Sequence, residues 1–373
     1  MTDRTPVHEL RALTGVRGIA AWFVVFYHIR LSIAGLPSGV RDVFAKGYLA
    51  VDFFFLLSGF VIWLTWSERI RTGGAASIPR FLQKRIARIW PLHLVTLGGA
   101  VALSLLLRAT GRSDPQFVFP ELPLHIMLLQ NWGFTHHLAW NDPAWSISAE
   151  LGAYLLFPLL VMAVDWRRLP SSALLAIIAG LLVGLHLAMD APTLGTDIPR
   201  YGLLRCLVEF TTGSIVCALW LRWRGVLRAP VWATLVAVLF AGAWIAGAPE
   251  TMVVPALLAV VLLLLALTAG RPGNPFELRW THYLGETSYA TYLSHFILWK
   301  AFKLVFVSDA TAVSLAKTVL YLAIVLLTSI VLYHLIERPA QRWLNGLPSR
   351  LREGSGEGRA SLAGRQYVRR TLP

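Results

Sequence analysis

The chain has 373 residues, of which 56% are hydrophobic and only 14% are charged, and 15 of them are Trp. A soluble globular domain has about 25% charged residues, so this chain lacks the polar surface needed to face water on all sides. Its net charge of +14 raises nucleic-acid binding as one interpretation. A basic membrane protein more often has its Lys and Arg sorted to cytoplasmic loops, so the positions of the charges decide between the two.

Apolar stretches of roughly 20 residues, long enough to cross about 30 Å of hydrocarbon as a helix, recur along the sequence. Pro and Gly mark most of the connections between them. We therefore predict an all-α integral membrane protein with about ten transmembrane helices in a domain over residues 1–340. The approximate cores of these spans are Gly18–Leu36, Gly47–Trp66, Ile89–Leu107, Pro143–Val164, Ser171–Met189, Tyr201–Leu221, Val231–Gly247, Met252–Ala269, His282–Val305 and Val313–Ile336.

Most of the 34 Lys and Arg residues fall on one side of this topology. They lie in the N-terminal segment, in the connections after the even-numbered spans and in the C-terminal segment. The positive-inside rule then predicts that both termini are cytoplasmic, and nucleic-acid binding loses its main support. Residues 341–373, with Arg among Gly and Ser, have the composition of a basic, disordered cytoplasmic tail on anionic lipid.

The first span carries two ionisable residues on one face. Arg17 and His28 are eleven positions apart, and eleven steps of about 100° return to within about 20° of the start. The two side chains would be about 16 Å apart along the helix axis, with Arg17 at the cytoplasmic mouth and His28 in the outer half. The competing interpretation is structural: Arg17 anchors the helix at the membrane surface, and His28 bonds a neighbouring helix.

Three further ionisable groups are expected at the depth of His28. Asp52 and Glu150 lie early in spans entered from outside, and His295 lies in the outer part of a span that runs outward. Ionisable groups inside a membrane are expensive and usually face a bundle interior or a wet cavity. Although each group alone could be structural, their common depth predicts a buried reaction centre.

A basic group precedes the third span on the cytoplasmic side, and it comprises Arg80, Lys84, Arg85 and Arg88. Arg85 and Arg88 share a helix face and could bind phosphates bidentately, or they could be ordinary membrane anchors. The basic residues would lie at the cytoplasmic side, and the layer of His and carboxylate groups would lie in the outer half of the membrane. This arrangement suits a substrate with an anionic head and a reactive end. Acyl-coenzyme A (acyl-CoA) has that shape.

These segments resemble the acyltransferase-3 family, multi-span bacterial enzymes that O-acylate surface glycans, lipid-linked glycans and some antibiotics. The chain has the family's arrangement of Arg, ten residues and His at Arg17 and His28. The other matching pieces, in family order, are Val51–Phe60, Arg85–Pro91, Trp145–Glu150 with Tyr154 and Pro158, Leu284–Tyr289 with Tyr292 and His295, and Glu337–Pro339.

Two departures from the family pattern are visible. The family usually has Gly before its Val-Asp pair, where this chain has Ala50, which is a small steric change. Its tryptophan motif commonly continues Glu-Glu-Gln-Phe-Tyr, whereas this chain continues from Glu150 with Leu151, Gly152, Ala153 and Tyr154. Glu150 is therefore the only carboxylate available at that motif.

The resemblance implies transfer of an acyl group, chiefly acetyl, from cytoplasmic acyl-CoA to a hydroxyl of a glycan, glycolipid or related acceptor in the bacterial inner membrane. His28 has the intrinsic pKa of a general base, and either Glu150 or Asp52 could hold its tautomer. A variant in which His28 is itself acylated stays open. The remaining assigned residues are Arg17, Arg85 and Arg88 for the donor, and Trp145, Ser148, Tyr292 and His295 for the acceptor.

The main alternative is a proton-coupled transporter or flippase of glycan or lipid precursors, because such proteins also carry intramembrane His, Asp and Glu. Many transporters contain inverted repeats, and the sequence shows no second copy of the Arg17 and His28 helix. The expected partners are acyl-CoA, the acceptor and membrane lipids, with no nucleic acid. No metal and no permanently bound cofactor are expected.

Overall fold

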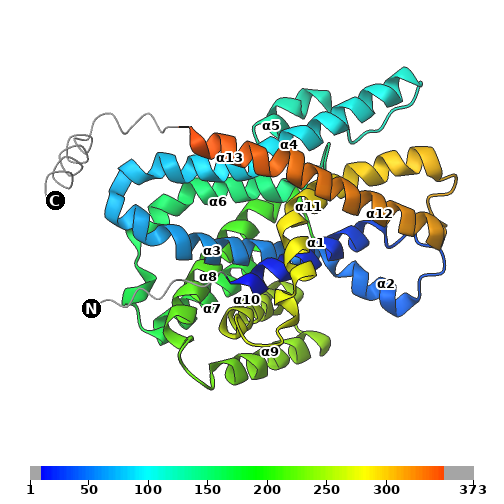
Figure 1. Cartoon of the computed structure of the whole chain (residues 1–373). Helices are drawn as coiled ribbons and strands as arrows, with labels where there is room; N and C mark the ends of the chain where they lie inside the picture. The colour runs from blue at the N-terminus through cyan, green and yellow to red at the C-terminus, as the bar shows by residue number, and fades with distance from the viewer. Residues whose placement is uncertain (1–9, 348–373) are drawn as a thin grey trace, which may run out of the picture.

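The computed structural model describes residues 10–347, and regular structure in that range is helical apart from one isolated β-bridge between Ile33 and Val313. The long helices are α1 (Arg11–Ile29), α3 (Ala50–Gly73), α4 (Ile78–Ala109), α6 (Ala144–Ala163), α7 (Ser171–Met189), α8 (Ile198–Trp223), α9 (Ala229–Ile245), α10 (Glu250–Thr268), α11 (Arg279–Phe306) and α12 (Leu315–Leu332). The shorter ones are α2 (Ser38–Ala45), α5 (Leu122–Ile126), the π-helical turn η6 (Tyr333–Glu337) and α13 (Arg338–Gly346). Figure 1 shows their arrangement.

Each predicted span core overlaps one of the long helices, but the predicted count of about ten is not confirmed. Seven stretches are long and apolar enough to cross a membrane. One of them, Ser38–Ala109, contains both α3 and α4, while α9 has only 17 residues and the polar α11 is not among them. The chain is thus a multi-pass, all-helical membrane protein in its described part, with seven candidate spans.

The first helix lies closer to the N-terminus than predicted. It begins at Arg11 and ends at Ile29, whereas the predicted core was Gly18–Leu36. The segment after Ile29 leaves the helix because Ser32 and Ala34 exchange backbone hydrogen bonds with Val313, and a following glycine has a φ of +68°. Arg17 therefore lies in the second turn of α1, and His28 lies in its last turn.

Glycines bring the central helices into backbone contact. A Cβ on Gly59 of α3 would lie 1.8 Å from the carbonyl oxygen of Phe210 in α8, and one on Gly213 of α8 would lie 1.9 Å from that of Leu56. In the same way, α1 packs against α11, where a Cβ on Gly285 would lie 1.8 Å from the Thr14 oxygen. Small residues at helix contacts are typical of membrane bundles, because they permit close backbone approach.

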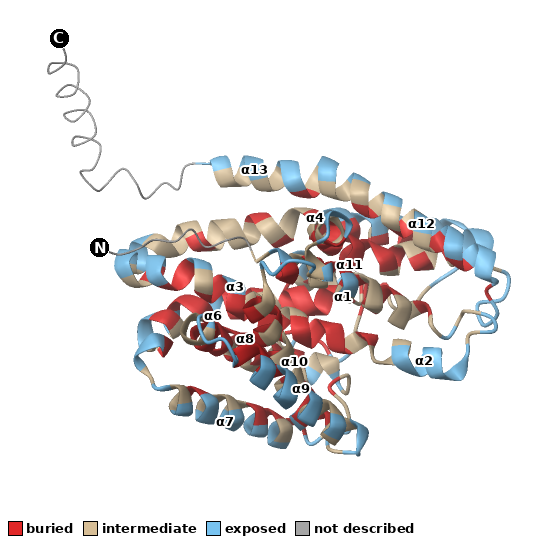
Figure 2. Ribbon diagram, turned by 60° about the horizontal axis from the view of Figure 1, so that its bottom comes forward, coloured by how far each residue is buried: buried red, intermediate tan, exposed pale blue. Residues whose placement is uncertain are grey.

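Burial separates a central group of helices from a peripheral group. Helices α3, α6 and α8 are buried over much of their length, whereas α7, α9, α12 and α13 have few or no buried residues (Figure 2). The exposed residues of α7 and α9 are large and apolar, including Leu187, Trp232, Leu239 and Ile245. In a bilayer this surface faces lipid, which matches the low charge content of the chain.

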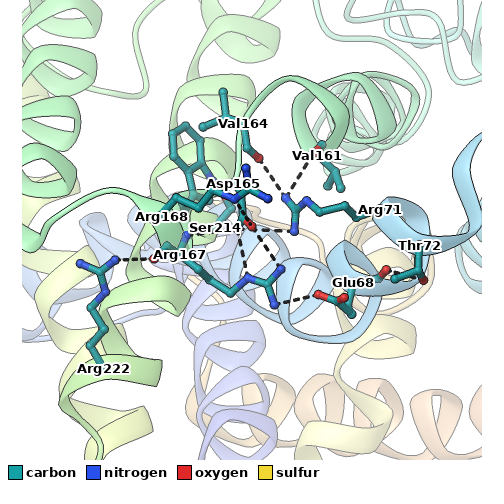
Figure 3. A network of polar contacts seen from close by, with 11 residues as sticks. Glu68, Arg71, Thr72, Val161, Val164, Asp165, Arg167, Arg168, Ser214 and Arg222 are labelled. Atoms are coloured by element: carbon teal, nitrogen blue, oxygen red, sulfur yellow. Dashed lines mark hydrogen bonds and ion pairs between the residues drawn. The ribbon is translucent and has the colours of Figure 1, made fainter.

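A polar network joins the ends of α3 and α6 on the predicted cytoplasmic side (Figure 3). Arg71 donates to the backbone oxygens of Val161 and Val164 and so caps the C-terminus of α6. Arg167 bonds Asp165 and forms an ion pair with Glu68 at 2.7 Å. Several of the predicted topology-setting arginines therefore also hold helix ends together.

The last described helix reaches into the predicted tail. Residues 341–346 belong to α13, and Arg80 and Gln83 of α4 donate to the backbone oxygens of Asn345 and Leu344 at its C-terminal end. Arg80, predicted within the basic group, thus caps a helix. The rest of the predicted tail, 348–373, lies outside the described residues.

Candidate functional site

A cavity of about 520 Å³ lies between α1, α3, α4, α6 and α11. Most of its wall is apolar, which is the usual character of small-molecule sites. The polar and charged lining residues come from all five helices: Thr14, Arg17, Ser58, Thr65, Arg85, Arg88, Ser146, Glu150, Tyr154, Ser288, Tyr289 and Tyr292. The three arginines assigned to the donor therefore line one cavity, together with Glu150 and Tyr292.

The three arginines differ in what they bind. Arg17 donates to the Gly285 oxygen at 3.2 Å and to the Ser288 hydroxyl at 3.1 Å, both on α11. Arg88 forms an ion pair with the buried Glu337. Arg85 lies over the ring of Tyr154, 5.9 Å from its centroid, and its buried Nε has no hydrogen-bond partner. Arg85 is the arginine with the most unused donor capacity towards the cavity.

Glu150 lines the same cavity and accepts a hydrogen bond from the Ser58 hydroxyl at 2.5 Å. This contact joins α6 to α3 and fixes the carboxylate on the cavity wall. No contact between Glu150 and His28 occurs among the described residues. The carboxylate is thus positioned to act on groups inside the cavity.

His28 and His295 lie side by side. Their ring centroids are 4.9 Å apart, and Nε2 of His295 lies 3.2 Å from Nδ1 of His28. Nδ1 of His28 also lies 2.9 Å from the Val24 oxygen, and Nδ1 of His295 lies 3.2 Å from the Thr291 oxygen. Arg17 and His28 both contact α11, as expected for residues on one face of α1.

The cavity and the histidine pair are neighbours but are not continuous. Neither histidine lines the cavity, whose wall ends at Tyr292 and Ser146. The Tyr292 hydroxyl lies 2.8 Å from that of Ser146 and donates to the Pro143 oxygen, and its ring centroid is 6.2 Å from that of His295. Tyr292 therefore stands between the two parts of the site, one helical turn from His295.

Asp52 occupies a different place from His28. It is fully buried and pairs with Arg205 of α8, whose Nη2 and Nε lie 2.6 Å and 3.2 Å from its Oδ1. Glu209, one turn further along α8, is also fully buried. This ion pair joins α3 to α8, and no described contact connects Asp52 to His28.

Trp145 and Ser148 lie behind the cavity wall rather than on it. Trp145 packs under the guanidinium of Arg205, 5.3 Å from the ring centroid to Cζ. The Ser148 hydroxyl donates to the Leu128 oxygen and accepts from the Asn131 backbone N–H. Leu128 has a φ of +57°, a strained value for a leucine, so Ser148 holds a loop in an unfavourable conformation.

That loop, residues 110–143, is tied to the histidine region. Asn141 donates to the Leu293 oxygen at 2.9 Å, two positions from His295, and Lys300 of α11 pairs with Asp114. Burial raises the pKa of the Asp142 carboxyl to about 6, although Gln116 donates to both of its oxygens. The loop therefore fixes the start of α6 against the end of α11 that carries His295.

Sequence reasoning missed Arg205, Glu209 and the role of Glu337. The rule that selected Asp52, namely an ionisable residue within an apolar span, applies equally to Arg205 and Glu209 and would have found them. Glu337 sits at the end of the last predicted span, and its pairing with Arg88, 249 positions away, leaves no local signal. Within residues 10–347, no three His, Cys, Asp or Glu side chains are arranged to hold a metal ion.

Comparison with known proteins finds several relatives of this chain. The chain is 32% identical to acyltransferase MdmB of Streptomyces mycarofaciens over 78% of this chain and 79% of that protein. It is 26% identical to exopolysaccharide production protein ExoZ of Rhizobium meliloti, over 80% of this chain and 91% of ExoZ. Peptidoglycan O-acetyltransferase OatA of Listeria monocytogenes is 25% identical over 59% of this chain and 35% of its own length.

No solved structure matches the chain significantly. The acyltransferase-3 family, described as an acyltransferase domain, matches residues 10–334, nearly the whole of the described part. The family, MdmB and OatA are all named for acyl transfer. The chain therefore belongs to the acyltransferase-3 family and is an O-acyltransferase.

Proposed function

We propose that this enzyme transfers an acetyl group from cytoplasmic acyl-CoA to a hydroxyl of a glycan, glycolipid or related acceptor. The observation that carries the proposal is the cavity that joins Arg17, Arg85 and Arg88 to Tyr292, one helical turn from the His28 and His295 pair. It supports a donor held by its anionic head at the arginines, with its apolar arm along the wall and its thioester near the histidines.

The acceptor class is supported by the relatives. ExoZ is named for exopolysaccharide production and OatA for O-acetylation of peptidoglycan, so both names refer to a glycan. The proposal extends that class to this chain. We also propose ten spans in a bacterial inner membrane, and the charge distribution supports an even number of spans with both termini cytoplasmic.

The hydrogen bonds around the two histidines favour one pair of tautomers. If Nδ1 of His295 donates to the Thr291 oxygen, its Nε2 is left as an acceptor for the Nδ1–H of His28. The Nδ1–H of His28 then points at Val24 and His295, and its Nε2 keeps a free lone pair. In this proposal His295, and neither carboxylate, orients the base.

In this proposal one base, His28, carries out both proton transfers of the reaction. Nε2 of His28 removes the proton of the acceptor hydroxyl while the hydroxyl oxygen attacks the thioester carbonyl carbon. The C–S bond of the tetrahedral intermediate breaks, the imidazolium returns the proton to the departing thiolate, and the products are an ester and free CoA. Tyr292 must turn aside for the acyl group to reach His28, because its ring lies between them.

The other two assigned carboxylates have supporting roles in this proposal. Glu150 faces the arginines across the cavity and holds Ser58, so it balances their charge where the thioester passes. Asp52 keeps α3 on α8 through Arg205 and so preserves the cavity wall that carries Ser58. Neither carboxylate exchanges a proton with substrate.

Purified protein in detergent, supplied with labelled acetyl-CoA and a glycolipid extract, tests the function. We expect label to enter the acceptor and His28→Ala to lower kcat by about 10²-fold or more, as for removal of a general base. His295→Leu should lower kcat without changing KM for acetyl-CoA. His295→Gln, which retains an acceptor near the position of Nε2, should recover part of the loss.

Two results would count against the proposal. Full activity in a folded His28→Ala protein would remove the base from the mechanism. Absence of acetyl-CoA turnover in the wild-type protein, together with glycan movement across vesicles, would favour the transporter interpretation.

A further inference from the structure

A second, smaller cavity of about 210 Å³ adjoins the arginine end of the large cavity. The two cavities share Thr14, Arg17 and Arg88 in their walls. The rest of the small cavity is lined by Glu286 of α11, Tyr333 of η6, and Arg338 and Gln341 of α13. Every lining side chain is polar or charged, in contrast to the mostly apolar wall of the large cavity.

Arg338 supplies the uncommitted positive charge of this small cavity. Arg88 is paired with Glu337, and Arg17 already donates to α11. Within residues 10–347, no ion pair or hydrogen bond engages the exposed guanidinium of Arg338. Its five donors therefore remain available to an anion.

The π-helical turn at residues 333–337 shapes this wall. A π-turn widens the helix by one residue and is frequent at functional sites. Here Glu337 is turned inward to Arg88, 1% exposed, while the next residue, Arg338, faces the small cavity. Gln341, which also lines the small cavity, donates to Glu337 at 3.3 Å.

We propose that the small cavity binds the phosphate-bearing nucleotide head of the donor, with Arg338 as its main phosphate ligand. This inference rests on the proposed function, since it assumes an acyl-CoA donor. Guanidinium groups bind phosphates bidentately, and the carboxylate of Glu286 suits a ribose hydroxyl or the adenine amine. The shared residues Arg17 and Arg88 mark the point where the head joins the pantetheine arm in the large cavity.

Comparing two donors tests the site, because acetyl-pantetheine keeps the thioester and lacks the nucleotide. We expect Arg338→Gln to lower kcat/KM for acetyl-CoA about 10-fold or more, because one charge-assisted contact is lost. The same variant should leave kcat/KM for acetyl-pantetheine unchanged. Arg342→Gln is the matched control, since Arg342 is one turn along α13, exposed and outside both cavities. Arg342→Gln should leave kcat/KM for both donors unchanged.

Binding of free CoA and of adenosine 3′,5′-bisphosphate, measured without acceptor, gives a second readout. Weaker binding of both by the Arg338→Gln protein, with unchanged binding by the Arg342→Gln protein, supports the site. The nucleotide site is overturned if the two variants bind CoA equally well, or if Arg338→Gln lowers kcat/KM equally for both donors. Either result leaves the proposed acyltransferase function intact. A wild-type protein that neither binds CoA nor uses acetyl-CoA overturns the proposed function and this inference with it.

Discussion

His28 and His295 come from helices that are far apart in the chain, yet their rings are 4.9 Å apart. Their neighbours are backbone oxygens and each other, so the pair needs no carboxylate to set its tautomers. Two uncharged imidazoles cost less to bury than a histidine paired with an ionised carboxylate. At the residue scale, the proposed base is therefore a pair of imidazoles rather than a histidine with a carboxylate.

The 110–143 loop contains two aspartates whose pKa values are shifted in opposite directions by the fold. Burial raises the pKa of Asp142 to about 6. Burial also acts to raise the pKa of Asp114, but hydrogen bonds from Lys300 and the Gln116 backbone outweigh it, and the pKa is lowered. The carboxyl of Asp142 has a higher pKa in the folded state than in the unfolded state. Its ionisation therefore makes the protein less stable as the pH rises from about 4 to about 6.

We predict that Asp142→Asn raises the apparent Tm at pH 7.5, since it removes the cost of a buried ionised carboxylate, up to about 3 kcal/mol for two pKa units. The gain should shrink as the pH falls towards 4, where the wild-type carboxyl is protonated as well. Asp114→Asn is the contrasting variant and should lower Tm at pH 7.5, because its charged form is stabilised by Lys300. Melting curves between pH 4 and 8 measure both, and a pH-independent gain for Asp142→Asn would contradict the first expectation.

At the scale of elements, glycine contacts determine how the central helices meet. Gly59 and Gly213 bring α3 and α8 together about two helical turns from the pair of Asp52 and Arg205. The buried ion pair would be costly in a looser interface, because its desolvation is offset only by close, well-directed contact. Close helix packing and the buried charges therefore depend on each other.

Gly59→Ala should destabilise the protein by about 1 to 3 kcal/mol, because its Cβ would overlap the Phe210 oxygen and force the helices apart. Gly98→Ala on α4 is the matched control, since nothing lies within 4 Å of the added carbon. It should be neutral or stabilising by about 1 kcal/mol through helix propensity. Thermal denaturation of both variants in one detergent provides the measurement, and equal stability of the two would refute the packing account.

The positions of long helices were predictable from apolar runs, and the end of α1 was not. Each predicted core overlaps a helix because about 20 apolar residues in sequence are a local signal. The end at Ile29 depends on hydrogen bonds that Ser32 and Ala34 form with Val313, about 280 positions away. Likewise, the sequence alone could select Arg17 and Glu150 as individual site residues. It could not predict that Arg88 pairs with Glu337, or Asp52 with Arg205, because these contacts are visible only in the fold.

At the scale of the whole molecule, the charge asymmetry supplies a prediction of orientation. With both termini cytoplasmic, Gly39 in α2 lies outside and Gly225 after α8 lies inside. Both glycines are exposed with open space around them, and the native Cys206 and Cys217 are buried. In intact cells, a membrane-impermeant maleimide should label Gly39→Cys and spare Gly225→Cys, which should react only after lysis. The reverse pattern would invert the orientation.

The wall formed by Tyr292 and Ser146 has a further consequence for the cell. Arg17, Ser146 and Tyr292 line the large cavity, whereas His28 does not. A catalyst that drew its donor from one side of a membrane and served an acceptor on the other through a permanent water file would dissipate the proton gradient across that membrane. In the proposed mechanism Tyr292, hydrogen-bonded to the start of α6, would therefore let the bilayer remain an electrical insulator between turnovers.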